Sequence, residues 1–108
     1  MDAALRAIAE PNRRRILALV REDELSAGEI AAHFDVTRPA VSQHLTVLKL
    51  AGLITERRAG TRRLYRAQPQ ALAELRLFLE EFWDDRLATL KEEAEKKERT
   101  GHGDERHD

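Results

Sequence analysis

The sequence predicts a mainly α-helical fold in which four short helices precede a β-hairpin and one long last helix. Three observations support this order. Apolar residues recur every three or four positions over residues 2–50 and again after residue 69, which is typical of amphipathic helices. Between these stretches, an arginine-rich segment around Gly60 predicts two short strands joined by a turn. Capping residues and prolines mark the helix boundaries.

The first two helices are predicted from apolar spacing and from a proline. Residues 2–10 place Leu5 and Ile8 on one side of a short helix. Pro11 fits the first turn of a second helix, because the amide hydrogen that it lacks would have no helical partner there. We assign Arg13–Arg15 of this helix to a solvated face. Its inner face consists of Ile16, Leu17 and Val20.

Capping signals define the third and fourth helices. Ser26 followed by Glu29 is the capping-box pattern of a helix start. The apolar side of this third helix is expected to contain Ile30, Ala31 and Phe34. Thr37 caps the fourth helix, which has Pro39 in its first turn and ends at Gly52, where glycine permits a left-handed backbone.

The fourth helix has an unusual polar face. Val41, Leu45 and Leu48 define its buried direction at about 100° per residue. The opposite face has hardly a charge and contains Pro39, Ser42, Gln43 and Thr46, with Arg38 and Lys49 towards one edge and His44 towards the other. Gln pairs bidentately with adenine, Ser and Thr donate or accept, and Arg favours guanine or phosphate. We therefore expect this face to enter a major groove of DNA, where acids would be repelled by phosphates.

The hairpin supports this interpretation. Its strands are predicted at 53–58 and 62–67, joined by Ala59-Gly60-Thr61, and four arginines flank the glycine. Such a basic finger can follow the phosphate backbone or reach into the minor groove, and we expect at least two of the arginines to contact phosphate. A helix-turn-helix followed by a basic hairpin is a winged helix. The predicted DNA-binding residues are Thr37, Arg38, Pro39, Ser42, Gln43, His44, Thr46, Lys49, Arg57, Arg58, Arg62 and Arg63.

Composition narrows the classes of function. Cysteine is absent, which excludes disulfides, thiolate metal sites and cysteine nucleophiles. No apolar run approaches the length of a membrane span and no signal peptide opens the chain, so we expect a cytoplasmic protein. The net charge of −1 conceals an asymmetry: residues 11–67 carry +5, residues 68–108 carry −5 and residues 1–10 carry −1. A basic middle is typical of a part that binds a polyanion.

Three segments resemble the ArsR-type winged-helix transcriptional repressors: AEPNRRRILALV, LSAGEIAAHFDVTRPAVSQHLTVLKLAGLI and RRAGTRRLYRA. The resemblance extends over about residues 3–90, and its most specific parts are the run Ser42–Leu45, the run Leu48–Ile54 and the wing ending in Leu64-Tyr65. It implies a homodimer, paired through its first and last helices, that binds a pseudo-palindromic operator in double-stranded DNA and represses its own operon.

The sequence departs from the metal-sensing members of that family. Many of these use cysteines in the third helix, where this chain has ELSAGEI, and others use histidines on the last helix, where residues 69–98 contain none. The resemblance therefore carries over the DNA-binding scaffold and not the metal sensor. His102 and His107 lie in a polar tail, residues 99–108, which we expect to be disordered rather than a metal site. We expect no metal and no cofactor.

The last helix, predicted over residues 69–98, has more apolar residues than one packing face needs. Its surplus would form an exposed patch on a monomer, and such patches mark partner surfaces. We expect this patch to pair two copies of the chain, each consisting of one domain over residues 1–98. The predicted dimer interface contains Leu5, Ile8, Leu75, Phe78, Leu79, Phe82 and Trp83.

Two other classes of function, an enzyme and a winged helix that binds only proteins, fit the sequence less well than a DNA-binding regulator. An enzyme would need a convergent cluster of titratable groups, and the sequence has no glycine-rich phosphate loop and no metal-ligand spacing on a helix. A winged helix that binds only proteins is the alternative, and the basic hairpin argues against it. The role of His44 stays open between packing and a phosphate contact. The signal that releases the protein from DNA is also open: it is a small molecule, a partner protein or neither.

Overall fold

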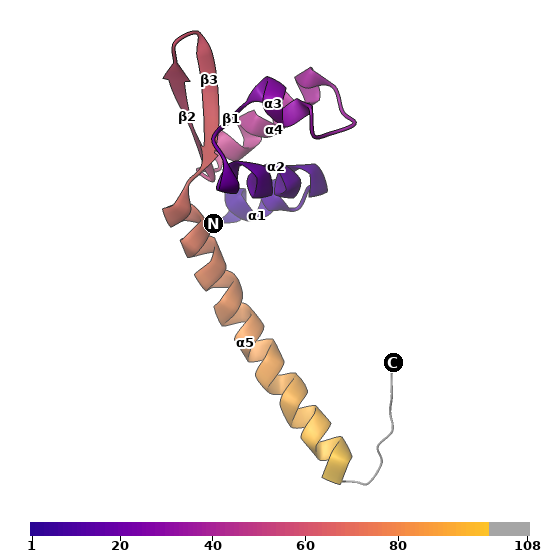
Figure 1. Cartoon of the computed structure of the whole chain (residues 1–108). Helices are drawn as coiled ribbons and strands as arrows, with labels where there is room; N and C mark the ends of the chain where they lie inside the picture. The colour runs from indigo at the N-terminus through magenta and orange to yellow at the C-terminus, as the bar shows by residue number, and fades with distance from the viewer. Residues whose placement is uncertain (100–108) are drawn as a thin grey trace. The chain divides into compact units, whose positions relative to one another are not determined.

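The computed structural model describes residues 1–99, with side chains except at 83–89, 91 and 95–99. Within this part, four short helices and three strands precede one long helix (Figure 1). By its internal contacts the chain divides into two compact units, Met1–Leu75 and Arg76–Asp108. In order, the elements are α1 Asp2–Ile8, α2 Pro11–Glu22, β1 Leu25–Ser26, α3 Ala27–Ala31, α4 Arg38–Leu50, β2 Ile54–Ala59, β3 Arg62–Ala67 and α5 Pro69–Arg99.

Helix α2 begins at Pro11 as predicted, and its first arginines bind the end of α1. The Arg13 Nε donates to the carbonyl oxygen of Ala7 at 2.7 Å, and the Arg14 Nη1 donates to that of Ile8 at 2.7 Å. These carbonyls lie in the last turn of α1, where no helical amide reaches them. The assignment of the arginines to a solvated face is therefore wrong for Arg13, which is half-buried.

The predicted capping box of α3 is confirmed. The Glu29 amide donates to Ser26 Oγ at 3.2 Å, and the Ser26 amide donates to Glu29 Oε1 at 2.8 Å. The helix is shorter than expected, because it ends at Ala31 in tight turns, with the Phe34 amide donating to the Ala31 carbonyl. Phe34 thus lies beyond the helix, where the Arg15 guanidinium stacks 4.3 Å from its ring centroid.

Both ends of α4 follow the sequence prediction. Thr37 Oγ1 accepts the Ala40 amide at 3.2 Å at the start of the helix. At the other end Gly52 has a φ of 79°. The Gly52 amide donates to the Lys49 carbonyl and the Leu53 amide to the Leu48 carbonyl, both at 3.0 Å, which is the Schellman arrangement. This cap turns the chain directly into β2.

The sheet has three strands in the order β1-β3-β2, all antiparallel, where we expected only two. The missed strand is β1, in which Leu25 pairs with Tyr65 and Ser26 pairs with Leu64. A strand of two residues is too short to show an alternating pattern in the sequence. The hairpin itself is confirmed with a tighter loop, since β2 extends through Ala59 and only Gly60 and Thr61 connect the strands. Gly60 has a φ of 66°, as two-residue hairpin loops require.

One hydrophobic core holds the first unit together. Full burial of each of its Ile, Leu and Val side chains contributes about 1.5–3 kcal/mol. The Gln68 amide donates to the Leu53 carbonyl at 2.8 Å, which ties the start of α5 to the end of the α4–β2 turn. The core consists of Ala7, Ile16, Leu17, Val20, Ile30, Val41, Leu45, Leu48, Leu53, Ile54, Ala67 and Leu75.

Helix α5 agrees with the predicted bounds. Leu75 is its last buried side chain among those described, and residues 76–82, 90 and 92–94 are all exposed. No helix in the described part of the chain is both long and apolar enough to cross a membrane. Residues 100–108, most of the tail predicted to be disordered, lie outside the described residues.

Candidate nucleic-acid interface

Helix α4 exposes the face that its sequence predicted. Val41, Leu45 and Leu48 are buried, and the helix is thereby fixed in one rotational setting on the core. Every predicted DNA-binding residue of α4 and its cap except His44 is exposed: Thr37, Arg38, Pro39, Ser42, Gln43, Thr46 and Lys49.

Two side chains on this face are available to bases. Gln43 makes no side-chain hydrogen bond with any described residue, so its amide keeps both a donor and an acceptor. The Thr46 hydroxyl donates to the Ser42 carbonyl at 3.0 Å, which leaves its methyl group and its acceptor lone pairs towards solvent. Such groups can contact base edges and thymine methyl groups.

The sequence prediction missed an apolar member of this face. Leu50 is 81% exposed, and 100° per residue places it close to Gln43, directly opposite the buried direction. Val47, at 39% exposed, lies beside them. The position of Leu50 on the helical wheel could have shown that it belongs to the exposed face.

His44 of α4 contacts an arginine of α2. It is half-buried, and its Nδ1 lies 3.3 Å from Arg13 Nη1. Because a guanidinium only donates, Nδ1 is the acceptor in this contact. His44 thereby joins α4 to the arginine that caps α1.

A cleft separates the start of α4 from the wing, defined here as β2, β3 and their loop. Its volume is about 520 Å³. The Arg38 guanidinium lies over the first turn of α3, where Nη1 would be 3.5 Å from a Cβ on Gly28. Three arginines therefore meet around this cleft, and its lining includes Arg38, Ser42, Thr61, Arg62, Arg63 and Tyr65.

The register of the wing sorts its four arginines onto two faces. Arg58 is directly opposite Arg63, and Glu56 is opposite Tyr65. Since side chains alternate along a strand, Arg58 and Arg63 share a face with Glu56, whereas Arg57 and Arg62 lie on the other face. Two like charges in directly opposed positions repel each other, which an anion between them would relieve.

On the first face, one carboxylate joins the wing to α4. The two oxygens of Glu56 lie 2.7 Å from Lys49 Nζ and 3.4 Å from Arg63 Nη1. Arg58 has no ion pair with a described residue. Glu56 thus places Lys49 of the helix and Arg63 of the wing side by side.

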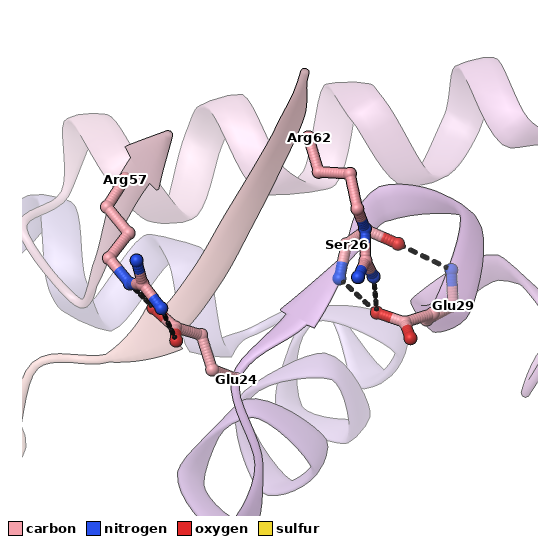
Figure 2. A network of polar contacts seen from close by, with 5 residues as sticks. All are labelled: Glu24, Ser26, Glu29, Arg57 and Arg62. Atoms are coloured by element: carbon pink, nitrogen blue, oxygen red, sulfur yellow. Dashed lines mark hydrogen bonds and ion pairs between the residues drawn. The ribbon is translucent and has the colours of Figure 1, made fainter. Parts of the chain in front are cut away.

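On the second face, two carboxylates from the body hold the wing (Figure 2). Arg57 Nε and Nη2 donate to the two oxygens of Glu24 at 2.6 and 2.8 Å, a bidentate pair. Arg62 Nη2 donates to Glu29 Oε1 at 2.8 Å. Two of the four predicted DNA-binding arginines are therefore paired with acids more than thirty residues earlier in the chain.

These contacts keep the three glutamates charged. Hydrogen bonds from Arg57 hold the pKa of Glu24 below its ordinary value, and Glu24 in turn raises the pKa of Arg57. The pKa of Glu29 is lowered first by the backbone amide and hydroxyl of Ser26 and then by Arg62. The hydrogen bond from Lys49 lowers the pKa of Glu56. All three carboxylates are consequently charged at neutral pH, and their four ion pairs with Arg57, Arg62, Lys49 and Arg63 are intact.

The predicted dimer residues do not form one exposed set. Leu75 is only 6% exposed and belongs to the core, so it is not available to a partner. Leu5 and Ile8 are half-buried against the core. Phe78, Leu79 and Phe82 are 42%, 40% and 63% exposed, and the side chain of Trp83 lies outside those described. Leu77 and Leu90 are also exposed.

A metal site would need several His, Asp or Glu side chains close together. Within the described residues, no three side chains of His, Asp or Glu lie close enough to hold a metal ion. His102 and His107 are outside this part of the chain.

The buried setting of α4, its exposed polar face and the basic wing define a winged helix-turn-helix regulator that binds DNA. Residues 10–56 match the family described as bacterial regulatory protein, arsR family. The HTH-type transcriptional regulator Rv2034 of Mycobacterium tuberculosis is 49% identical over 82 residues, which are 76% of this chain and 77% of that protein. The transcriptional repressor SdpR of Bacillus subtilis is 42% identical over 56% of this chain and 67% of its own length.

Solved structures agree with this likeness. A crystal structure described as a possible transcriptional regulator for arsenical resistance has a TM-score of 0.74 and 44% identity, over 86% of this chain and 96% of that one. The homodimeric winged helix-turn-helix domain of Mb0332 from Mycobacterium bovis has a TM-score of 0.64 and 30% identity, over 80% of each chain. The chain belongs to the ArsR family of bacterial transcriptional regulators, which are not enzymes.

Proposed function

We propose that the protein is a homodimeric repressor that binds a pseudo-palindromic operator, with α4 in the major groove and the wing along the phosphate backbone. The observation that supports this most is the exposed, charge-poor face of α4, fixed next to an arginine-rich hairpin by Lys49, Glu56 and Arg63. A protein-binding surface would not need four wing arginines beside such a face.

The bases are read from α4. Gln43 pairs with an adenine, because its unbonded amide offers the donor and acceptor that adenine matches. Ser42 and Thr46 contact neighbouring base edges, and Leu50 offers an apolar surface to a thymine methyl group. Arg38 and Thr37, at the start of the helix, bind phosphate.

The backbone is held by the face of the wing that includes Arg58 and Arg63. These two opposed guanidiniums need an anion between them, and Arg58 has no carboxylate of its own among the described residues. A phosphate of the DNA satisfies both. Arg57 and Arg62, which the sequence ranked equally with them, are held by Glu24 and Glu29.

Two copies pair through apolar surface on α5, at Phe78, Leu79 and Phe82, together with Leu5 and Ile8 of α1. Exposed phenylalanines of this kind are costly on a monomer. The homodimeric Mb0332 domain supports the pairing. A two-fold dimer then binds half-sites about 34 Å apart, one turn of DNA.

The protein represses transcription in the cytoplasm by occupying its operator. The name of SdpR as a repressor supports this direction of control. Release by a small molecule or by a protein inducer is compatible with the exposed surface of α5, and the inducer itself stays open.

Selection of bound fragments from the source genome, followed by fluorescence anisotropy with the selected duplex, tests the proposal. We expect tight binding to the selected duplex, weaker binding to an unrelated duplex of equal length, and a dimer by sedimentation at micromolar concentration. Equal affinity for all duplexes, or a monomer on the operator, would overturn it. Repression is tested separately, with a reporter under the selected operator in cells with and without the protein.

A further inference from the structure

Glu29 serves two elements with one carboxylate oxygen. Its Oε1 accepts the Ser26 amide at 2.8 Å, which completes the cap of α3, and it also accepts Arg62 Nη2 at 2.8 Å (Figure 2). Both side chains of the ion pair are about half exposed, at 48% for Glu29 and 54% for Arg62. Arg62 of the wing is therefore already bound to a carboxylate oxygen in the absence of DNA.

The arginine of this ion pair lies at the cleft between α4 and the wing, and Glu29 is not part of the cleft lining. Arg62 lines the cleft together with Arg38, Arg63 and Ser42, which are part of the candidate DNA-binding surface. A phosphate entering the cleft would find Arg62 already paired with the Glu29 carboxylate. It would have to replace that carboxylate or bind beside a negative charge.

The second pair on the same face offers a comparison. Arg57 is bound bidentately by Glu24, and neither residue lines the cleft. The two glutamates are thus alike in charge and in binding a wing arginine, and neither is part of the cleft lining; the pairs differ because Arg62 lines the cleft and Arg57 does not.

We propose that Glu29 is a specificity-determining residue, because it withholds Arg62 from phosphate contacts that carry no sequence information. The inference rests on the proposed function. A free arginine at the cleft would strengthen binding to every duplex alike, since phosphate contacts are the same in all sequences. With Arg62 bound to Glu29, more of the affinity comes from α4 and its base contacts.

Neutralising Glu29 without removing its cap is the test. Glu29→Gln keeps a side-chain oxygen for the Ser26 amide, because glutamine also forms the capping box. The freed Arg62 adds one phosphate contact in each protomer. The slope of log affinity against log salt concentration then becomes steeper by about 0.9 per protomer, or about 1.8 per dimer. Between about 50 and about 200 mM salt, this is roughly a twelvefold larger loss of affinity.

The experiment compares five proteins on the selected operator and on an unrelated duplex: the wild type, E29Q, E24Q, R62A and the double variant E29Q/R62A. We expect E29Q to bind the unrelated duplex more tightly and with a steeper salt slope, so that the ratio of the two affinities falls. The double variant should return to the values of R62A. E24Q removes the same charge away from the cleft and should change much less. Urea unfolding should show that E29Q still folds cooperatively, with a stability at neutral pH somewhat below that of the wild type.

Three results would overturn the inference while the proposed function stands. Unchanged DNA binding by E29Q would make the pair an ordinary surface contact. Weaker binding to both duplexes would mean that Glu29 anchors the wing in its binding position. An equal effect of E24Q would assign the change to net charge alone. If the wild type binds no duplex DNA, the proposed function fails first and the inference fails with it.

Discussion

Replacing Arg58 and Arg63 together with alanine tests which face of the wing meets DNA. The two residues are directly opposed on β2 and β3 and share the face that Glu56 joins to Lys49 of α4. Neither side chain is buried, so their removal should leave the fold intact. The variant R57A/R62A is the matched control, because it removes the same charge from the same hairpin on the opposite face.

The magnitude follows from the number of phosphates. Two contacts per protomer make four per dimer, and each changes the slope of log affinity against log salt by about 0.9. The slope of R58A/R63A should therefore be less steep by about 3.6 units, which is roughly a 150-fold smaller loss of affinity between about 50 and about 200 mM salt. For R57A/R62A we expect a change of about 0.5 units or less, since Glu24 and Glu29 hold those arginines.

Fluorescence anisotropy over a series of salt concentrations measures both slopes, on the selected operator and on an unrelated duplex. R58A/R63A should lose affinity for both duplexes by a similar factor, because it removes contacts without sequence information. A larger change in slope for R57A/R62A than for R58A/R63A would refute the assignment of faces. A loss confined to the operator would show that the wing reads bases.

Four other properties can be predicted. Gln43→Ala should lose about 1–3 kcal/mol of discrimination at one base pair per half-site, measured with operators substituted one position at a time. Gly52→Ala should lower the free energy of unfolding by about 1 kcal/mol and the melting temperature by about 4–8 °C, because its φ is 79° and no atom within 4 Å would clash with the methyl group. Phe82→Asp should shift sedimentation towards the monomer, since a charge would have to be buried at the interface. The lowered pKa values of Glu24 and Glu29 give stability that is present above the ordinary glutamate pKa and is lost as the pH falls through the lowered values. The variant E24Q/E29Q should therefore lose less stability than the wild type from about pH 5 to about pH 3 in urea titrations.

Each of these has an outcome that contradicts it. An equal loss on every operator would remove Gln43 from base recognition. A melting temperature of Gly52→Ala equal to the wild type would mean that the Schellman cap tolerates a Cβ. An unaltered dimer in Phe82→Asp would place the interface elsewhere. A parallel acid dependence of E24Q/E29Q and the wild type would show that other carboxylates govern acid unfolding.

Local patterns in the sequence predicted most of the first unit. The spacing of Val41, Leu45 and Leu48 set the rotation of α4, because a helix buries the face on which its apolar residues recur. Ser26 with Glu29 and Gly52 marked helix ends, since caps depend on groups only a few residues apart. The exposed polar face of α4, and with it the DNA-binding class, followed from the same local information.

Strand β1 and the role of Leu75 needed the folded chain. Leu25 and Ser26 become a strand only by pairing with Tyr65 and Leu64, some forty residues later. Leu75 belongs to the same stripe as Phe78 and Phe82, and periodicity says only that they share a face. Which of them the core covers depends on where the core ends along α5.

The partners of the wing arginines were decided by tertiary structure alone. In the sequence, Arg57, Arg58, Arg62 and Arg63 are four equivalent charges beside a turn. The register of β2 and β3 divides them into two faces, and the fold brings Glu24 and Glu29 to one of these from thirty-three residues earlier. A charge has no preferred partner along the chain, because its interaction energy depends on distance in space, and only the packed fold sets that distance.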